Sequence, residues 1–192
     1  MSTKGSLEGF DQHKSLAELQ SCLPLILQSP ALAGRVGMIV CRPRTGERKI
    51  LQNCQLNTSD GLLGDNWKQR GQWKVPDKPA NVDMQLNLMN LRAITAIAAD
   101  QAQWPLAGDQ FYVDLDLSQQ NLPAGTRLMI GSAVIEVTAE PHLGCRKFAE
   151  RFGRDAVAFV NSDEGKQLNL RGINARVISA GQVSVGDEIR KL

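Results

Sequence analysis

Cys145 combines a chemically versatile side chain with a position that favours its ionised form. It directly precedes a segment of helical composition, 146–152. A thiol at a helix start lies at the positive end of the helix dipole, and Arg146, Lys147 and His142 add positive charge nearby. These features favour the thiolate, the form that attacks sulfur or binds a soft metal. A small buried residue with an idle thiol is the structural alternative, and spacing alone does not decide between them.

The glycine-rich segment Gly61–Asp65 is a second candidate. Glycines let the backbone approach a ligand closely, and successive amides can bind anions such as phosphate, which makes Gly64 a candidate ligand contact. Asp65 could orient a ring nitrogen of a ligand or a neighbouring basic side chain. The alternative is a plain turn, which is the interpretation we favour for the similar pair Gly186-Asp187.

A phosphate-bearing cofactor needs basic side chains, and several lie near these segments. They are Arg42, Arg44, Arg92, Lys147, Arg151 and Arg171. Lys147 and Arg171 are the first candidates for cofactor binding, together with His142. We expect most of the others to be solvated surface charges.

Several other kinds of site have little support in the sequence. The cysteines at 22, 41 and 54 fit buried positions in a helix and two strands, and no C-x-x-C pair predicts structural zinc. P-loop, dinucleotide-binding, zinc-protease and hydrolase-elbow motifs are absent. Two histidines also leave little for a multi-histidine metal site or a conventional hydrolase triad.

The elements that must position these residues are mostly short strands. Leucine spacing over 15–27 predicts a helix that Pro24 interrupts near Leu23. Strand patterns follow at 36–41, 49–56, 84–88, 111–117, 126–130, 133–138, 173–179 and 183–189. Gly131-Ser132 predicts a two-residue hairpin turn between 126–130 and 133–138. Short helices are expected at 91–99, capped by Asn90, and at 146–152 and 155–160. The irregular stretch 57–80 is long enough to be a functional loop.

Many short strands with glycine turns favour a mainly β barrel or sandwich over a doubly wound sheet. We therefore expect a helical lead-in at 1–34 and a β domain at 35–192.

Composition narrows the class of protein. The chain has 192 residues, 42% hydrophobic and 22% charged, which is typical of a globular domain. A net charge of +2 gives no bulk electrostatic case for nucleic-acid binding. No apolar run approaches a membrane span, and the N-terminus lacks a secretory pattern, so we expect a cytoplasmic protein.

The order of short motifs resembles the MOSC family, named after the C-terminal domain of molybdenum cofactor sulfurase. The resemblance covers about residues 35–190. It rests on the segments 61–65, 85–96, 108–111, 122–125, 128–131, 134–138, 145–148, 151–153, 170–173 and 181–187. One departure is Gly144, because many relatives place proline directly before the cysteine.

The resemblance implies a β-barrel similar to the barrel domain of pyruvate kinase, with a few short helices. It implies that Cys145 matches the family cysteine that carries sulfur or ligates molybdenum, and that a molybdenum cofactor (molybdopterin) is the ligand. No pyridoxal phosphate site is expected on this chain. A separate sulfur donor of the cysteine desulfurase type, or a separate electron-donor reductase, would then be needed.

Three functions remain open from the sequence. The first is cofactor binding or sulfur carriage through Cys145, and the second is the reduction of N-hydroxylated compounds with a separate reductase. The third is a non-catalytic ligand-binding or regulatory barrel without molybdenum.

Overall fold

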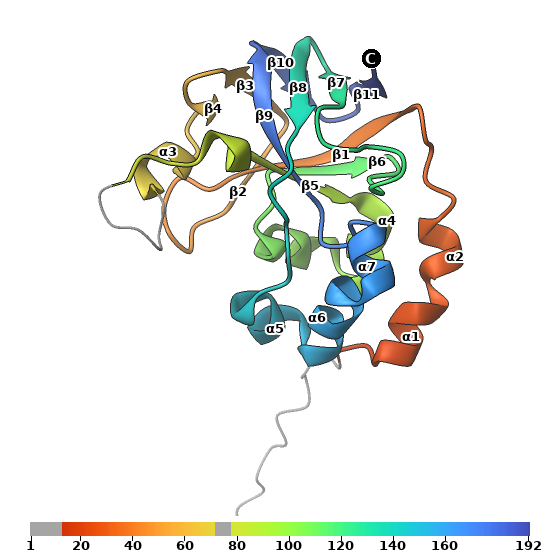
Figure 1. Cartoon of the computed structure of the whole chain (residues 1–192). Coiled ribbons are helices and arrows are strands. Elements are labelled where there is room, and N and C mark those ends of the chain that lie inside the picture. Colours follow the sequence, from red (N-terminus) through yellow and green to blue (C-terminus); the bar gives the residue numbers. More distant parts are fainter. Residues whose placement is uncertain (1–12, 72–77) are drawn as a thin grey trace, which may run out of the picture.

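A closed β-barrel forms the centre of the computed structural model, which describes residues 13–71 and 78–192 (Figure 1). The strands are β1 (Ala33–Cys41), β2 (Lys49–Leu51), β3 (Asn53–Asn57), β4 (Gly61–Leu62), β5 (Leu86–Asn90), β6 (Phe111–Asp114), β7 (Arg127–Ile130), β8 (Ala133–Val137), β9 (Ile173–Ser179), β10 (Gly181–Ser184) and β11 (Glu188–Lys191). Among the described residues, seven strands pair in the ring β1-β11-β7-β8-β9-β5-β6, and β6 returns to β1. The mainly β barrel expected from the sequence is confirmed.

Two further features complete the strand arrangement. The strand β2 extends the sheet beyond β1, and β10, β3 and β4 form a separate three-stranded sheet. Of the pairings in the described part of the chain, β5 with β6 is parallel and the others are antiparallel. The helix α4 (Leu91–Ile97) lies between β5 and β6 in the chain and supplies the crossover that a parallel pair requires.

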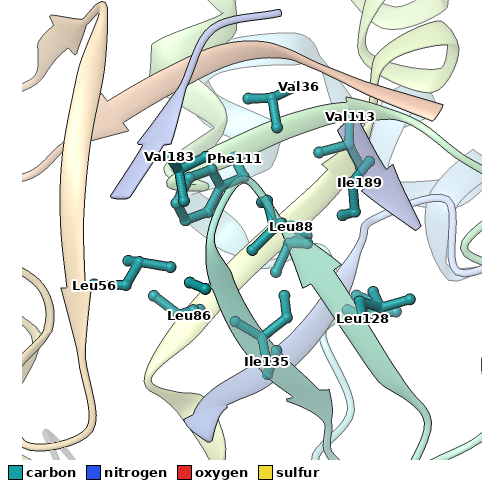
Figure 2. Packing of buried hydrophobic residues seen from close by; sticks show 14 of the residues in the cluster. Val36, Leu56, Leu86, Leu88, Phe111, Val113, Leu128, Ile135, Val183 and Ile189 are labelled. Atoms are coloured by element: carbon teal, nitrogen blue, oxygen red, sulfur yellow. The ribbon is translucent and has the colours of Figure 1, made fainter. Parts of the chain in front are cut away.

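Inward-facing side chains of alternating strand residues fill the barrel. Figure 2 shows Leu86 and Leu88 from β5 together with Phe111 from β6 and Ile135 from β8. All four are fully buried, and full burial of such a side chain stabilises a fold by about 1.5–3 kcal/mol. This core fixes the strand ends from which the loops of the site emerge.

A second core joins the helices to the outside of the barrel. The remaining helices are α1 (Leu16–Ser21), α2 (Leu23–Ile26), α3 (Trp67–Arg70), α5 (Arg146–Phe152), α6 (Arg154–Asn161) and α7 (Asp163–Gln167), with 3₁₀ helices η1 (Val82–Met84) and η2 (Gln101–Ala107). In Figure 1, α1, α2 and α4–α7 gather below the barrel, whereas α3 lies beside β4. Phe148 and Phe159 from the helices share this core with Met38 and Tyr112 from the strands. No helix within the described ranges could cross a membrane.

Local sequence signals predicted several element boundaries correctly. The Asn90 side chain accepts a hydrogen bond from the Ala93 amide and caps α4. The helix predicted at 146–152 is α5, which ends before Gly153. The hairpin turn at Gly131-Ser132 joins β7 to β8.

Other predicted elements were wrong in detail. The strand predicted at 49–56 is interrupted at Gln52, where the chain passes from β2 to β3 and into a different sheet. Met84 lies in η1 and is 39% exposed, so the buried strand begins only at Leu86. Leu27, assigned to the apolar face of the first helix, is 59% exposed, because the helix breaks at Cys22 and α2 buries Ile26 instead.

Candidate functional site

Cys145 is the cysteine whose thiol is exposed to solvent. It is the residue before α5, has an extended backbone, and its side chain makes no capping hydrogen bond. Cys41 and Cys54 are buried in the barrel core, and burial raises the pKa of both thiols, that of Cys54 to about 12. Cys22 is partly buried and donates to the Glu18 carbonyl at 3.4 Å. Thiolate chemistry therefore favours Cys145.

The cations next to Cys145 are as exposed as the thiol. Lys147 lies on the solvent side of α5, and Arg146 forms an ion pair with Glu150 at 3.3 Å in which both side chains are largely exposed. Such exposed pairs have little energetic effect because water and salt screen them. Lys147 is not among the residues that line the nearby pocket described below.

A side chain from α6 fixes the backbone immediately before Cys145. Asn161 accepts from the Gly144 amide at 2.8 Å and donates to the Gly144 carbonyl at 2.9 Å. A Cβ on residue 144 would lie 2.9 Å from Cγ2 of Val160, so glycine is what allows this close approach to α6. The two peptide groups on either side of Gly144, of which the second leads into Cys145, are thus both held by Asn161.

We expect Asn161→Ala to loosen this segment. Two hydrogen bonds are lost, which should lower the free energy of unfolding by about 1–3 kcal/mol and accelerate hydrogen exchange of the Gly144 amide. Asn121→Ala is the matched control, because Asn121 also donates to two backbone carbonyls, those of Ala31 and Asp116. Denaturation and hydrogen exchange of both variants test this. Unchanged hydrogen exchange at the Gly144 amide in Asn161→Ala would show that Asn161 does not clamp the backbone before Cys145.

A pocket of about 550 Å³ lies beside the loop that leads to Cys145. Its lining includes His142 and Leu143 from this loop, and it also includes Lys166 from α7, Asn169 and Arg171 from the segment between α7 and β9, and Asn174 from β9. Cys145 itself follows two residues after Leu143 and is not part of the lining. The structure therefore brings His142 and Arg171 together at the pocket, with the thiol beyond its wall.

Arg171 and His142 share a buried partner, Asp109, that the sequence did not single out. Arg171 Nη1 donates to Asp109 Oδ2 at 2.7 Å, and its guanidinium carbon lies 4.9 Å from the ring centre of Phe148. His142 Nδ1 lies 3.5 Å from Asp109 Oδ1. Burial, followed by the charge of Arg171, lowers the pKa of His142 well below its usual value. His142 is therefore a neutral ring facing a carboxylate rather than half of an ion pair.

Three buried polar atoms of this group have no hydrogen-bond partner among the described residues: Asp109 Oδ1, His142 Nδ1 and Arg171 Nε. The first two face each other, so a proton on Nδ1 would join them by a long hydrogen bond. Burial raises the pKa of Asp109, while Arg171 opposes that rise. Arg171 Nε remains a buried donor on a residue that lines the pocket, and an unpaired buried donor costs about 1–3 kcal/mol.

Asp65 lies in a second polar network that reaches the same loop from the other side. Its carboxylate accepts from Arg42 Nε and Nη2 at 2.9 Å, and also from the amides of Arg42 and Trp67. Arg42 Nη1 donates to Asn87, Asn87 donates to Asn174, and Asn174 donates to the carbonyl of residue 140. The chain of contacts thus connects Asp65 to the loop before Cys145.

The glycine-rich segment is not part of the pocket lining. The carboxylate oxygens of Asp65 already accept hydrogen bonds from Arg42 and from backbone amides. Gly64 is exposed, and a Cβ built on it would lie 3.7 Å from Cys41 Sγ. Neither residue lines the pocket beside Cys145. Asp65 therefore acts on the loop before Cys145 through Arg42. Direct contact of Gly64 or Asp65 with a ligand stays a prediction.

The site residues that sequence reasoning missed are polar residues within buried strands, or residues that lie far in sequence from the residues they contact. Asn87 and Asn174 are buried within β5 and β9, where apolar residues are expected, and that mismatch was a usable signal. Asp109 lies just before β6 and Asn161 ends α6, and neither position carries a local pattern that indicates its role.

Comparison with known proteins identifies the fold and the family. The MOSC domain model matches residues 80–190. The YuaD protein of Bacillus subtilis is 18% identical with a TM-score of 0.57, covering 82% of this chain and 94% of YuaD. YiiM of Escherichia coli is 21% identical with a TM-score of 0.54, covering 82% of this chain and 69% of YiiM. None of the curated proteins compared with the chain matches it significantly. These structural matches support the fold, and the domain match shows that the chain belongs to the MOSC family.

Proposed function

We propose that this MOSC protein binds a molybdenum cofactor, or carries a sulfur group, through the thiolate of Cys145. The observation that carries the proposal is an exposed thiol at the end of a clamped loop, the preceding residues of which line a pocket. A thiolate is a good ligand for soft metals and a good nucleophile toward sulfur. Cys145 would act directly, and Asn161 would position it.

The residues around the pocket fit a small anionic cofactor. A volume of about 550 Å³ falls within the range of small-molecule sites, which is about 300–1,000 Å³. The exposed Lys166 is a charged donor for an anionic ligand, Arg171 adds a second positive charge at the pocket wall, and Asn169 offers an amide to a heterocycle. The neutral His142 adds a ring edge without adding charge. When bound, the cofactor would supply the redox chemistry.

Sulfur carriage needs no metal. A donor persulfide, R–S–SH, would pass its terminal sulfur to the Cys145 thiolate. A new S–S bond forms at Cys145 as the donor's S–S bond breaks, and the donor departs as the thiolate R–S⁻. A separate protein of the cysteine desulfurase type would be the donor. Reduction of N-hydroxylated compounds would instead need a separate reductase. Either route fits the cytoplasmic location that we propose.

One observation favours a second candidate, a ligand-binding barrel without molybdenum. Cys145 is not among the residues that line the pocket, and Arg171 already uses two nitrogens on Asp109 and the Ala107 carbonyl. A small ligand could therefore occupy the pocket without contacting the thiol.

Metal and pterin analysis of anaerobically purified protein tests the proposal. We expect molybdenum and pterin in the wild type, and at least a tenfold lower content in Cys145→Ser, because a hydroxyl is a much poorer ligand for a soft metal (about 1.4 kcal/mol per tenfold change). Cys22→Ser is the matched control, since Cys22 lies between the N-terminal helices α1 and α2, and it should retain both.

Persulfide analysis of the same samples separates the two routes. A persulfide on Cys145 without molybdenum supports sulfur carriage. If wild type and Cys145→Ser contain equal amounts of metal, pterin and sulfane sulfur, the proposal is wrong and the ligand-binding barrel is favoured.

A further inference from the structure

The carbonyl oxygens of four consecutive residues, 105–108, each accept a hydrogen bond from a different arginine. In that order the donors are Arg48, Arg151, Arg171 and Arg42. The distances from Arg48, Arg171 and Arg42 are 3.1, 2.8 and 2.8 Å. Arg48 directly precedes β2, Arg151 lies in α5, and Arg171 lies in the segment before β9. Arg42 directly follows β1. The end of η2 thus gathers four positive charges in one place.

Among the described residues, buried ion pairs neutralise two of these four arginines. Arg42 pairs with Asp65 and Arg171 pairs with Asp109, and both of these pairs are buried. In the part of the chain that the structure describes, no carboxylate lies within ion-pair distance of Arg48 or Arg151. Two positive charges therefore remain uncompensated at the end of η2.

Within residues 13–71 and 78–192, Arg48 and Arg151 keep hydrogen-bond donors free for a ligand. Arg48 uses Nε on the residue 105 carbonyl and Nη1 on the Glu47 carbonyl, which leaves Nη2. Arg151 uses Nη1, which leaves Nε and Nη2. Both side chains are half-buried, so part of their hydration is already lost. A Cβ built on Gly108 would lie 3.6 Å from Arg48 Nη2, and with glycine there that nitrogen stays open.

The electrostatic environment of Arg48 agrees with this geometry. Burial, followed by the positive charges of Arg151 and Arg42, lowers the pKa of Arg48. Arginine stays charged nonetheless, so the cluster has a positive potential that a bound anion would relieve.

We propose that Arg48 and Arg151, anchored on the end of η2, form a binding site for a phosphate group through the guanidinium nitrogens that the η2 carbonyls do not use. Guanidinium groups recognise phosphate oxygens through paired, charge-assisted hydrogen bonds, and prior anchoring of both side chains on backbone carbonyls reduces the entropy lost on binding. The phosphate can belong to a bound cofactor or to a separate small-molecule phosphate. The site itself does not depend on the function proposed for Cys145.

Phosphate titration of the purified full chain tests this site. Inorganic phosphate, exchanged against chloride at constant ionic strength, should raise the Tm of the wild type in a saturable manner. In Arg48→Gln and Arg151→Gln the apparent Kd for phosphate should rise by about tenfold or more, because each change removes a charge-assisted contact. Arg44→Gln is the control, since Arg44 lies on the same hairpin, is exposed and is 4.0 Å from Glu47.

The wild type alone can overturn the proposal, even if a variant fails to fold. A Tm that does not respond to phosphate, or equal Kd values for Arg48→Gln and Arg44→Gln, would exclude the site. Cys145→Ser should bind phosphate as the wild type does, which keeps this test separate from that of the cofactor. Pterin content then assigns the source. A loss in Arg48→Gln relative to Arg44→Gln identifies the phosphate of the cofactor, and equal content identifies a separate phosphate ligand.

Discussion

Arg42→Met is expected to lower the free energy of unfolding by about 3–5 kcal/mol, because it removes one partner of a buried ion pair. The side chains of Arg42 and Asp65 are 5% and 0% exposed, and two hydrogen bonds of 2.9 Å join them. Methionine fills most of the volume but leaves the Asp65 carboxylate buried without a counter-charge. The Asn87 oxygen and the Gly108 carbonyl also lose their donor.

Arg44→Met is the matched control for this prediction. Arg44 is two residues away, its side chain is 87% exposed, and its ion pair with Glu47 is 4.0 Å long. We expect a change within about 0.5 kcal/mol there. Urea denaturation of both variants measures the difference. Similar losses in the two variants would show that the Arg42–Asp65 pair does not stabilise the barrel.

The effect should extend beyond stability. Because Arg42 connects through Asn87 and Asn174 to the loop before Cys145, a structural change at Arg42 can reach the site without touching it. Asp65 was a candidate ligand residue from its glycine-rich context. Its contacts give it a role in organising Arg42, which in turn fixes the strand ends below the loop.

Local chemistry explains which parts of the fold could be predicted. The cap at Asn90, the turn at Gly131-Ser132 and the end of α5 at Gly153 each depend on a few adjacent residues. The alternation of apolar residues predicted the β class, and the order of motifs predicted the family. The break between β2 and β3 was missed, because the partners that split this segment, β1 and β10, lie elsewhere in the chain.

The candidate site was only half predictable for the same reason. The position of Cys145 directly before a helix follows from neighbouring residues, whereas its exposure was left open by the sequence. Its supports do not, since Asn161 is 17 positions from Gly144 and Asp109 is 62 positions from Arg171. Nothing near Asp109 in the sequence distinguishes a buried ion-pair partner from a turn residue. The tertiary fold brings these side chains together.

Gly172→Ala is expected to have the second largest effect, a loss of about 2–5 kcal/mol from backbone strain and overpacking. Gly172 has φ +112°, and a Cβ there would lie 2.2 Å from the carbonyl oxygen of Leu88 and 3.2 Å from His142 Nδ1. The oxygen cannot move aside easily, because Leu88 is paired with Ile173 in the sheet.

Gly46→Ala separates the two causes: its φ is +86° but no atom lies within 4 Å, so it should lose only about 1–2 kcal/mol of backbone preference. Urea denaturation measures the loss of unfolding free energy in both variants. Equal losses would show that the close packing of Arg171 and His142 against β5 does not restrict the side chain at position 172. A larger loss at Gly172 means that glycine is needed there so that the buried Asp109–Arg171–His142 group can pack against the barrel.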